Sequence, residues 1–153
     1  MIQIRKAKTN DAEQIHELLT YWGKKDFLLP RSLNEIFGSI RDFCVYEKNN
    51  NVIGCSALHI VNKELGEIRS LAVEENSHNQ GIGKKLMEFM FNEAKEIGIT
   101  TLFALTYKDD FFKKLGFSRI DKESLPQKIW KDCINCIKFP NCNEIAMIRV
   151  VSP

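Results

Sequence analysis

Two glycines and two lysines stand close together in the stretch His78–Leu86, "HNQGIGKKL", in a spacing that suits the binding of an anion. The stretch follows the apolar run Ile68–Val73 and opens a long amphipathic segment, which predicts a strand-to-helix junction. The start of a helix has up to four unpaired N–H groups and about half a positive charge. The glycines remove side chains that would keep a ligand from these groups, and Lys84 and Lys85 add positive charge. This chemistry fits a phosphate or a diphosphate.

The glycine loop matches neither of the two common nucleotide-binding motifs. A Walker loop has four residues between its glycines, followed by Lys-Ser or Lys-Thr, and neither feature is present here. Leu86 stands where the dinucleotide motif G-x-G-x-x-G needs its third glycine. Taken alone, the loop also fits a glycine-rich helix start that binds nothing, so the ligand must be inferred from the rest of the chain.

The composition predicts one globular domain over residues 1–153, with 44% hydrophobic and 27% charged residues. A net charge of +2 is too small to favour nucleic acid as a partner. No apolar run approaches the roughly 20 residues of a membrane span, so we expect no membrane partner. The opening "MIQIRKAKTND" is polar and strand-like, unlike a signal peptide, and we expect a cytoplasmic location. The oligomeric state stays open, with a homodimer as one option.

The first half of the chain predicts two helices and a β-meander. The first strand covers 2–7, a helix runs from Thr9–Asp11 to Trp22, and Ser32 with Glu35 forms a capping box for a short helix. Three strand-like runs with short turns between them form an antiparallel meander. These runs cover residues 43–48, 52–61 and 66–73.

The second half predicts a parallel crossover around the glycine loop. A helix from Gly81 to Ile97, stopped by Gly98, leads to an apolar strand over Thr100–Thr106. Strand, helix and strand together make a right-handed parallel unit. Further elements are a short helix that ends at Gly116, a helical segment over 126–133 and a last strand over 143–150. The fold class is therefore a mixed α/β sheet.

The stretches "IRKAKTNDAEQI", "GEIRSLAVEENSHNQGIGKKLM" and "FFKKLGF" together resemble the GNAT superfamily of acetyl-CoA-dependent N-acetyltransferases, over nearly the whole chain. The superfamily's motif is (Gln/Arg)-x-x-Gly-x-(Gly/Ala) at the start of a helix that follows a strand. The segment 78–83 matches it, except that His78 replaces the usual Arg or Gln. The resemblance implies a mostly antiparallel α/β sheet with a splayed central strand pair and helices on both faces.

The resemblance also implies acetyl-CoA as the acyl donor, without a metal. Main-chain amides of the glycine loop would hold the diphosphate, and the pantetheine arm would pair with the strand before it. His78 leaves this main-chain site intact, although its own side-chain contact is not implied by the motif. The implied coenzyme-binding residues are Leu71, Ala72, Val73, His78, Asn79, Gln80, Gly81, Ile82, Gly83 and Lys84.

A narrower resemblance concerns the acceptor, the amine that receives the acetyl group. The stretches "LLPRS", "IRDF" and "LPQKIWKDCINCIKFPNCNEIAM" are similar to the short, single-domain N-acetylglutamate synthases of bacterial arginine biosynthesis. L-Glutamate has two carboxylates, and arginine holds a carboxylate with two parallel hydrogen bonds. We expect Arg31 and Arg69 to bind this acceptor, and the larger synthases carry a basic residue in a stretch like that of Arg31. Arg41, Lys24 and Lys25 are weaker candidates, and an ordinary surface cation is the alternative for each.

The attacking amine is mostly protonated at pH 7, so a base must remove a proton. We expect Glu67 to be that base, because strand alternation puts it on one face with Arg69, Leu71 and Val73. The alternative is a surface glutamate at a strand end. Many superfamily members place a tyrosine acid four residues before the glycine of "LGF", but Phe112 stands there. Tyr107 is the substitute candidate, and a thiolate leaving group can also depart without an acid.

Three cysteines, Cys133, Cys136 and Cys142, have the spacing C-x2-C-x5-C. A closed zinc site needs four ligands, and nothing in the sequence places a fourth beside them. Metal binding, a redox switch and packed thiols stay open, and we predict no metal site. The total of five cysteines argues against a disulfide framework, and Cys44 and Cys55 lie in apolar runs typical of buried thiols.

Two alternatives to a glutamate acetyltransferase remain. One is an acetyltransferase of the same superfamily that acts on another small amine or on a protein N-terminus, which would need an open, partly acidic groove in place of two cations. The other is a non-catalytic module that binds acyl-CoA or senses thiols. The absence of a tyrosine at position 112 and the cysteine cluster favour this module, and steady release of CoA would exclude it.

Overall fold

The computed structural model describes residues 1–25, 28, 31–78, 80–125 and 144–151. In this part of the chain seven strands form one sheet in the order β1-β2-β3-β4-β5-β7-β6. The strands are β1 (Ile2–Lys6), β2 (Phe43–Lys48), β3 (Asn51–Ile60), β4 (Leu65–Val73), β5 (Thr101–Thr106), β6 (Ser118–Ile120) and β7 (Ile145–Val150). Neighbouring strands are antiparallel except β4 and β5, which are parallel. The predicted mixed α/β sheet with its meander is confirmed.

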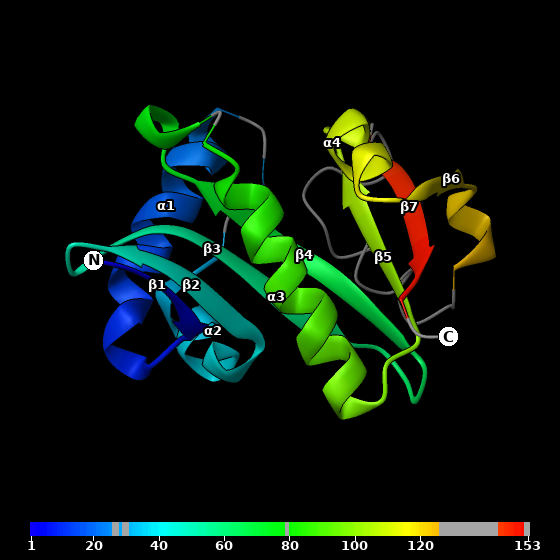
Figure 1. Ribbon diagram of the computed structural model, residues 1–153, viewed down its shortest axis with the longest axis horizontal. Coiled ribbons are helices and arrows are strands. Elements are labelled where there is room, and N and C mark those ends of the chain that lie inside the picture. Colours follow the sequence, from blue (N-terminus) through cyan, green and yellow to red (C-terminus); the bar gives the residue numbers. More distant parts are fainter. Residues whose placement is uncertain (26–27, 29–30, 79, 126–143, 152–153) are drawn as a thin grey trace.

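Helices cover both faces of the sheet (Figure 1). They are α1 (Ala12–Lys24), α2 (Leu33–Gly38), α3 (Ile82–Ile97) and α4 (Asp109–Lys114), with short 3-10 turns η1 (Thr9–Asp11), η2 (Ile40–Asp42), η3 (Glu75–Ser77) and η4 (Lys122–Ser124). The first two helices pack on one face and α3 packs on the other. No helix in the described part has the length and apolarity that crossing a bilayer requires. The helix predicted over 126–133 lies outside the described residues.

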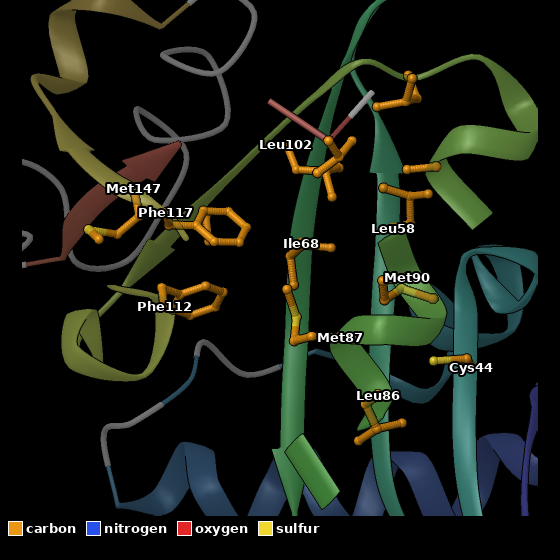
Figure 2. Close-up of a cluster of buried hydrophobic side chains, with 14 of the residues drawn as sticks. Cys44, Leu58, Ile68, Leu86, Met87, Met90, Leu102, Phe112, Phe117 and Met147 are labelled. Atoms are coloured by element: carbon orange, nitrogen blue, oxygen red, sulfur yellow. The ribbon is translucent and has the colours of Figure 1, made fainter. Parts of the chain in front are cut away.

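The core under α3 joins the two halves of the sheet. Leu86, Met87 and Met90 of α3 are fully buried against Ile68 of β4, and burying each such side chain contributes about 1.5–3 kcal/mol. Figure 2 shows Phe112, Phe117 and Met147 of the second half facing this group. The core therefore holds together the parts of the sheet on either side of β4 and β5.

The parallel strands β4 and β5 are paired over a short distance only. Their register runs from Leu65 opposite Thr101 to Glu67 opposite Phe103. Beyond these positions β4 stays paired with β3 up to Val73, and β5 stays paired with β7 up to Thr106. The two strands diverge in Figure 1, and the sheet opens between them. The predicted splayed strand pair is therefore confirmed.

A β-bulge at Ser70 changes which side chains of β4 face α1 and α2. Ser70 has a φ of +56°, and the register against β3 shifts between Cys55 and Ala57. The extra residue reverses the alternation of side chains, because the period of a strand is two. Arg69 consequently lines a cavity beside α2, whereas Leu71 and Val73 pack against the core under α3. The prediction that Glu67, Arg69, Leu71 and Val73 share one face is therefore wrong.

Candidate active site

The start of α3 lies at the opening between β4 and β5. Gly81, the N-cap of α3, has a φ of +74°, a conformation that glycine adopts without strain. A Cβ atom on Gly81 would meet no atom within 4 Å, and the residue has no side chain to cap the first N–H groups. These amide N–H groups donate to no capping side chain and can donate to an anion in the space before them. The site fits the diphosphate predicted from the sequence.

The absence of a side chain at Gly83 also allows close packing. A Cβ atom at this position would lie 3.2 Å from two carbon atoms of the Phe111 ring, tighter than nine in ten such contacts. The missing side chain therefore lets α4 approach the first turn of α3 from the other half of the sheet. Ile82 between the glycines is buried in the core, so only its backbone remains for a ligand.

The side chain of His78 contacts the end of β4 and the Trp22 ring of α1. Its ring stacks on the Trp22 ring, with centroids 5.2 Å apart and planes 7° apart. The Val73 carbonyl oxygen accepts a hydrogen bond from Trp22 Nε1 at 3.0 Å and lies 3.1 Å from His78 Nε2. The side chain that replaces the usual Arg or Gln thus ties the glycine loop to β4 and α1. This contact could not be deduced from the motif.

Two other residues of the glycine loop have exposed side chains. Gln80 and Lys84 are exposed near the start of α3, and Asn79 lies outside the described residues. Lys25, a weaker candidate for the acceptor, is 3.2 Å from the Glu75 carboxylate of η3. Lys24 is exposed at the end of α1.

A cavity of about 240 Å³ lies between β3 and β4 on one side and α2 with η2 on the other. Its lining residues are Arg31, Glu35, Gly38, Ser39, Asp42, Ala57, His59 and Arg69. The two arginines predicted for the acceptor are therefore brought together, although they are far apart in the sequence. Arg41 is exposed and is not part of this lining.

Arg31 is held by hydroxyl groups. Its Nη1 donates to Ser70 Oγ at 3.1 Å, its Nη2 donates to Ser39 Oγ at 2.8 Å, and its Cζ lies 5.2 Å from the centre of the Phe43 ring. Among the described residues no carboxylate lies within 4 Å of it. Burial and the charge of Arg69 lower the pKa of Arg31, yet a guanidinium stays protonated. The cavity therefore contains a cation that can bind an acidic ligand.

Glu67 stands at the point where β4 and β5 begin to separate. It is 6% exposed, and its Oε1 accepts a hydrogen bond from Arg69 Nε at 2.5 Å. His59 faces it across the β3–β4 pair, and Glu67 is the last residue of β4 that is paired with β5. The alternative of an exposed strand-end glutamate is therefore wrong.

Three further ionisable groups in the cavity, Glu35, Asp42 and His59, were missed as site residues by the sequence interpretation, which placed Glu35 only in a helix cap. Asp42 and His59 both line the cavity, and burial raises the pKa of Asp42 while the nearby charges of His59 and Arg31 oppose that change. Alternation along β3 places His59 on the same face as Ala57, which was the available signal for it. Asp42 lies within the stretch "IRDF", which had been noted only for resemblance.

Phe112 has a core position. It is 4% exposed and makes edge-to-face contacts with Phe111 and Phe117, whose ring centres lie 5.3 and 5.1 Å away. Tyr107, the substitute acid, follows the end of β5, across the opening from β4, and is partly buried.

The cysteines divide into two groups. Cys44 and Cys55 are buried free thiols, as predicted, and burial raises the pKa of Cys44 to about 12. Cys133, Cys136 and Cys142 lie outside the described residues. Within the described ranges, no three His, Cys, Asp or Glu side chains are grouped to hold a metal ion.

The fold and the site together define a class of protein. The sheet opens between two parallel strands and α3 begins after a glycine N-cap, as the resemblance to acetyl-CoA-dependent N-acetyltransferases implies. The family model of the GNAT acetyltransferase domain matches residues 39–119. The chain therefore belongs to the GNAT acetyltransferase family, and it is an N-acetyltransferase that uses acetyl-CoA. The resemblance noted in the sequence is confirmed.

Relatives and solved structures place the chain more closely within the family. An uncharacterized N-acetyltransferase from Chlorobaculum tepidum is 41% identical over 97% of this chain and 96% of its own length. An amino-acid acetyltransferase from Mycobacterium tuberculosis is 31% identical over 84% of this chain and 75% of its own length. The crystal structure of N-acetylglutamate synthase from Neisseria gonorrhoeae with coenzyme A and N-acetyl-glutamate superimposes with a TM-score of 0.92 at 28% identity. It is matched over 100% of this chain but only 36% of its own.

Proposed function

We propose that this N-acetyltransferase acetylates the amine of a small acidic amino acid, L-glutamate, and so performs the first step of arginine biosynthesis. The observation that carries the proposal is Arg31, a partly buried guanidinium beside a second one and without a carboxylate partner among the described residues. Relatives named amino-acid acetyltransferase and a structural neighbour that holds N-acetyl-glutamate support the same acceptor.

The two guanidinium groups of the cavity support a dicarboxylate more than a neutral amino acid, because each can bind a carboxylate. Arg31 and Arg69 repel each other, and an incoming carboxylate relieves that repulsion while it forms two parallel hydrogen bonds with a guanidinium. A volume of about 240 Å³ suits an amino acid and is small for a peptide segment. Glu35 and Asp42 line the same space and provide partners for the ammonium group of the acceptor.

In the proposed reaction, the amine nitrogen attacks the carbonyl carbon of the thioester. The C–N bond forms, the C–S bond breaks and coenzyme A leaves as a thiolate. Glu67 accepts the amine proton, directly or through water, and Arg69 stabilises its carboxylate anion. Tyr107 is the candidate to return a proton to the sulfur. The coenzyme would be held by Leu71–Val73 and by the amides at the start of α3.

The proposal is tested by measuring CoA release from acetyl-CoA with L-glutamate, L-glutamine and glycine at pH 7–8. We expect glutamate to give the highest kcat/KM, since glutamine has the same shape but one carboxylate fewer. Arg31→Ala should raise the KM for glutamate about tenfold, the loss expected for one charge-assisted contact. Arg41→Ala is the matched control and should leave KM unchanged, because Arg41 is exposed outside the cavity.

Equal kcat/KM values for glutamate, glutamine and glycine would contradict the acidic acceptor. A preference for a peptide amine would favour the alternative of a protein N-terminus, and no CoA release with any amine would favour a non-catalytic module. A cytoplasmic location is part of the proposal, and the free thiols of Cys44 and Cys55 are consistent with a reducing compartment.

A further inference from the structure

We infer that Ser70 is a positioning residue for the acceptor, whose hydroxyl group holds the guanidinium of Arg31 in its binding orientation. The inference rests on the proposed function, because it assigns to Ser70 a role in the binding of an acidic acceptor by Arg31. Ser70 was not among the residues expected from the sequence.

The backbone at Ser70 directs its hydroxyl group toward Arg31. Serine rarely adopts a positive φ, yet Ser70 has a φ of +56° at the bulge in β4. The residue is partly buried, and its Oγ accepts a hydrogen bond from Arg31 Nη1 at 3.1 Å. Non-glycine residues with this conformation occur mainly where the surrounding structure fixes them, often at functional sites.

The second contact of Arg31 comes from a different element. Ser39, the C-cap of α2, accepts from Arg31 Nη2 at 2.8 Å, and its own hydroxyl donates to the Glu35 carbonyl oxygen at 2.7 Å. The guanidinium is thus held between β4 and α2 by two neutral groups. The two hydroxyl groups fix the orientation of the guanidinium without cancelling its charge. That charge is therefore left to bind a carboxylate of the amino-acid substrate.

Ser70 also belongs to the strand that is expected to bind the acyl donor. It directly precedes Leu71–Val73, and its carbonyl oxygen accepts a hydrogen bond from the buried Cys55 Sγ at 3.4 Å. The main chain of Ser70 is therefore fixed to β3 while its side chain reaches the acceptor cavity. One residue thereby sets the position of Arg31 relative to the strand of the coenzyme.

A double-mutant cycle with Arg31 tests the inference. Ser70→Ala removes the hydroxyl group alone, and we expect it to raise the KM for glutamate roughly three- to fivefold, as for one ordinary hydrogen bond and less than the loss of the whole Arg31 side chain. The KM for acetyl-CoA should stay within about twofold, since the bulge itself is kept. In the Arg31→Ala background the same substitution should change the KM for glutamate by less than about twofold. Ser118→Ala, on exposed β6, is the matched control and should change neither constant.

Three results would overturn the inference. These are an unchanged KM for glutamate in Ser70→Ala, an equal increase of the KM for acetyl-CoA, or an effect that persists fully in the Arg31→Ala background. If Ser70→Ala does not fold, Ser70→Gly gives the same comparison, because glycine accepts the positive φ. A wild-type enzyme that does not prefer glutamate to glutamine would instead contradict the proposed function, so the two failures are distinguishable.

Discussion

At the scale of single residues, Glu67 and Arg69 form an ion pair where β4 and β5 separate. The carboxylate is 6% exposed, and its guanidinium partner is shared with the wall of the acceptor cavity. A buried carboxylate with a fixed partner can accept a proton in a defined direction, which is what an attacking amine needs. The pair thus lies between the cavity lined by Arg69 and the point where the pairing of β4 with β5 ends.

Glu67→Gln tests the role of this carboxylate. The amide has nearly the same shape but cannot accept the proton, so kcat should fall by about 10²- to 10⁴-fold. The KM for acetyl-CoA should be nearly unchanged, because strand alternation puts Glu67 on the face of β4 opposite Ile68, which packs under α3. The measurement is steady-state CoA release with saturating glutamate.

Glu64→Gln is the matched control for this substitution. Glu64 lies exposed in the turn that precedes β4, and its side chain should not affect turnover. Full activity of Glu67→Gln would exclude Glu67 as the base. An unfolded Glu67→Gln protein would be recognised by its circular dichroism and would be replaced by Glu67→Asp, which keeps the charge but withdraws the oxygen atoms.

The types of residue in the sequence predicted part of the site. The rest could not be predicted, because it depends on an irregularity of the backbone in β4. Arg31 and Arg69 were expected to bind together, and the structure places both in one cavity. The role of Ser70 was not visible, because a bulge depends on the register of β4 against β3 and not on a local sequence pattern. For the same reason Leu71 and Val73 were assigned to the wrong face.

At the scale of elements, an ion pair joins β1 to the start of α1. Nη1 and Nη2 of Arg5 donate to the Asp11 carboxylate, at 2.7 and 3.0 Å, and the Lys8 backbone N–H donates to it at 2.7 Å. Burial alone would raise the pKa of Asp11, but these hydrogen bonds outweigh it and lower the pKa below 3.8. The pair therefore stabilises the folded state whenever Asp11 is ionised.

Asp11→Asn should lower the free energy of unfolding at pH 7 by about 1–3 kcal/mol, as for a buried hydrogen bond to a charged group. A folded pKa below the unfolded one gives stability that is complete above the unfolded value and is lost as the pH falls through the folded value. The difference from wild type should therefore shrink as the pH falls below 3.8 and through the lowered pKa of Asp11. Urea unfolding at several pH values measures it.

Asp121→Asn, an exposed residue before η4 without a side-chain cap hydrogen bond, is the control and should be near neutral throughout. A loss of stability in Asp11→Asn that stays constant from neutral pH down to about pH 2 would contradict the assignment, since it would not depend on ionisation.

Most elements could be predicted from hydrophobic periodicity, because their buried faces follow the strand or helix period. The start of α3 after Gly81 and its stop at Gly98 were expected, and Gly98 has a φ of +95°. Boundaries were less accurate where a 3-10 turn precedes a helix, as at Thr9–Asp11. The packing of Phe111 against Gly83 could not be predicted, since it joins elements from the two halves of the sheet.

At the scale of the whole molecule, the two halves of the sheet meet through a short parallel pairing and through the core under α3 (Figures 1 and 2). The opening between the halves lies beside the start of α3, and the acceptor cavity lies on the side of α2. The arrangement supports approach of the two substrates from different sides to the region around Glu67. Acetyl transfer in a single direct step is consistent with such an arrangement.

The most direct test of this account is a crystal structure of the protein with coenzyme A and N-acetyl-L-glutamate. The account predicts the diphosphate at the main-chain amides that begin α3, after Gly81, and a carboxylate of the product within hydrogen-bond distance of Arg31. A diphosphate bound away from these amides, or a product whose carboxylates contact neither Arg31 nor Arg69, would contradict it.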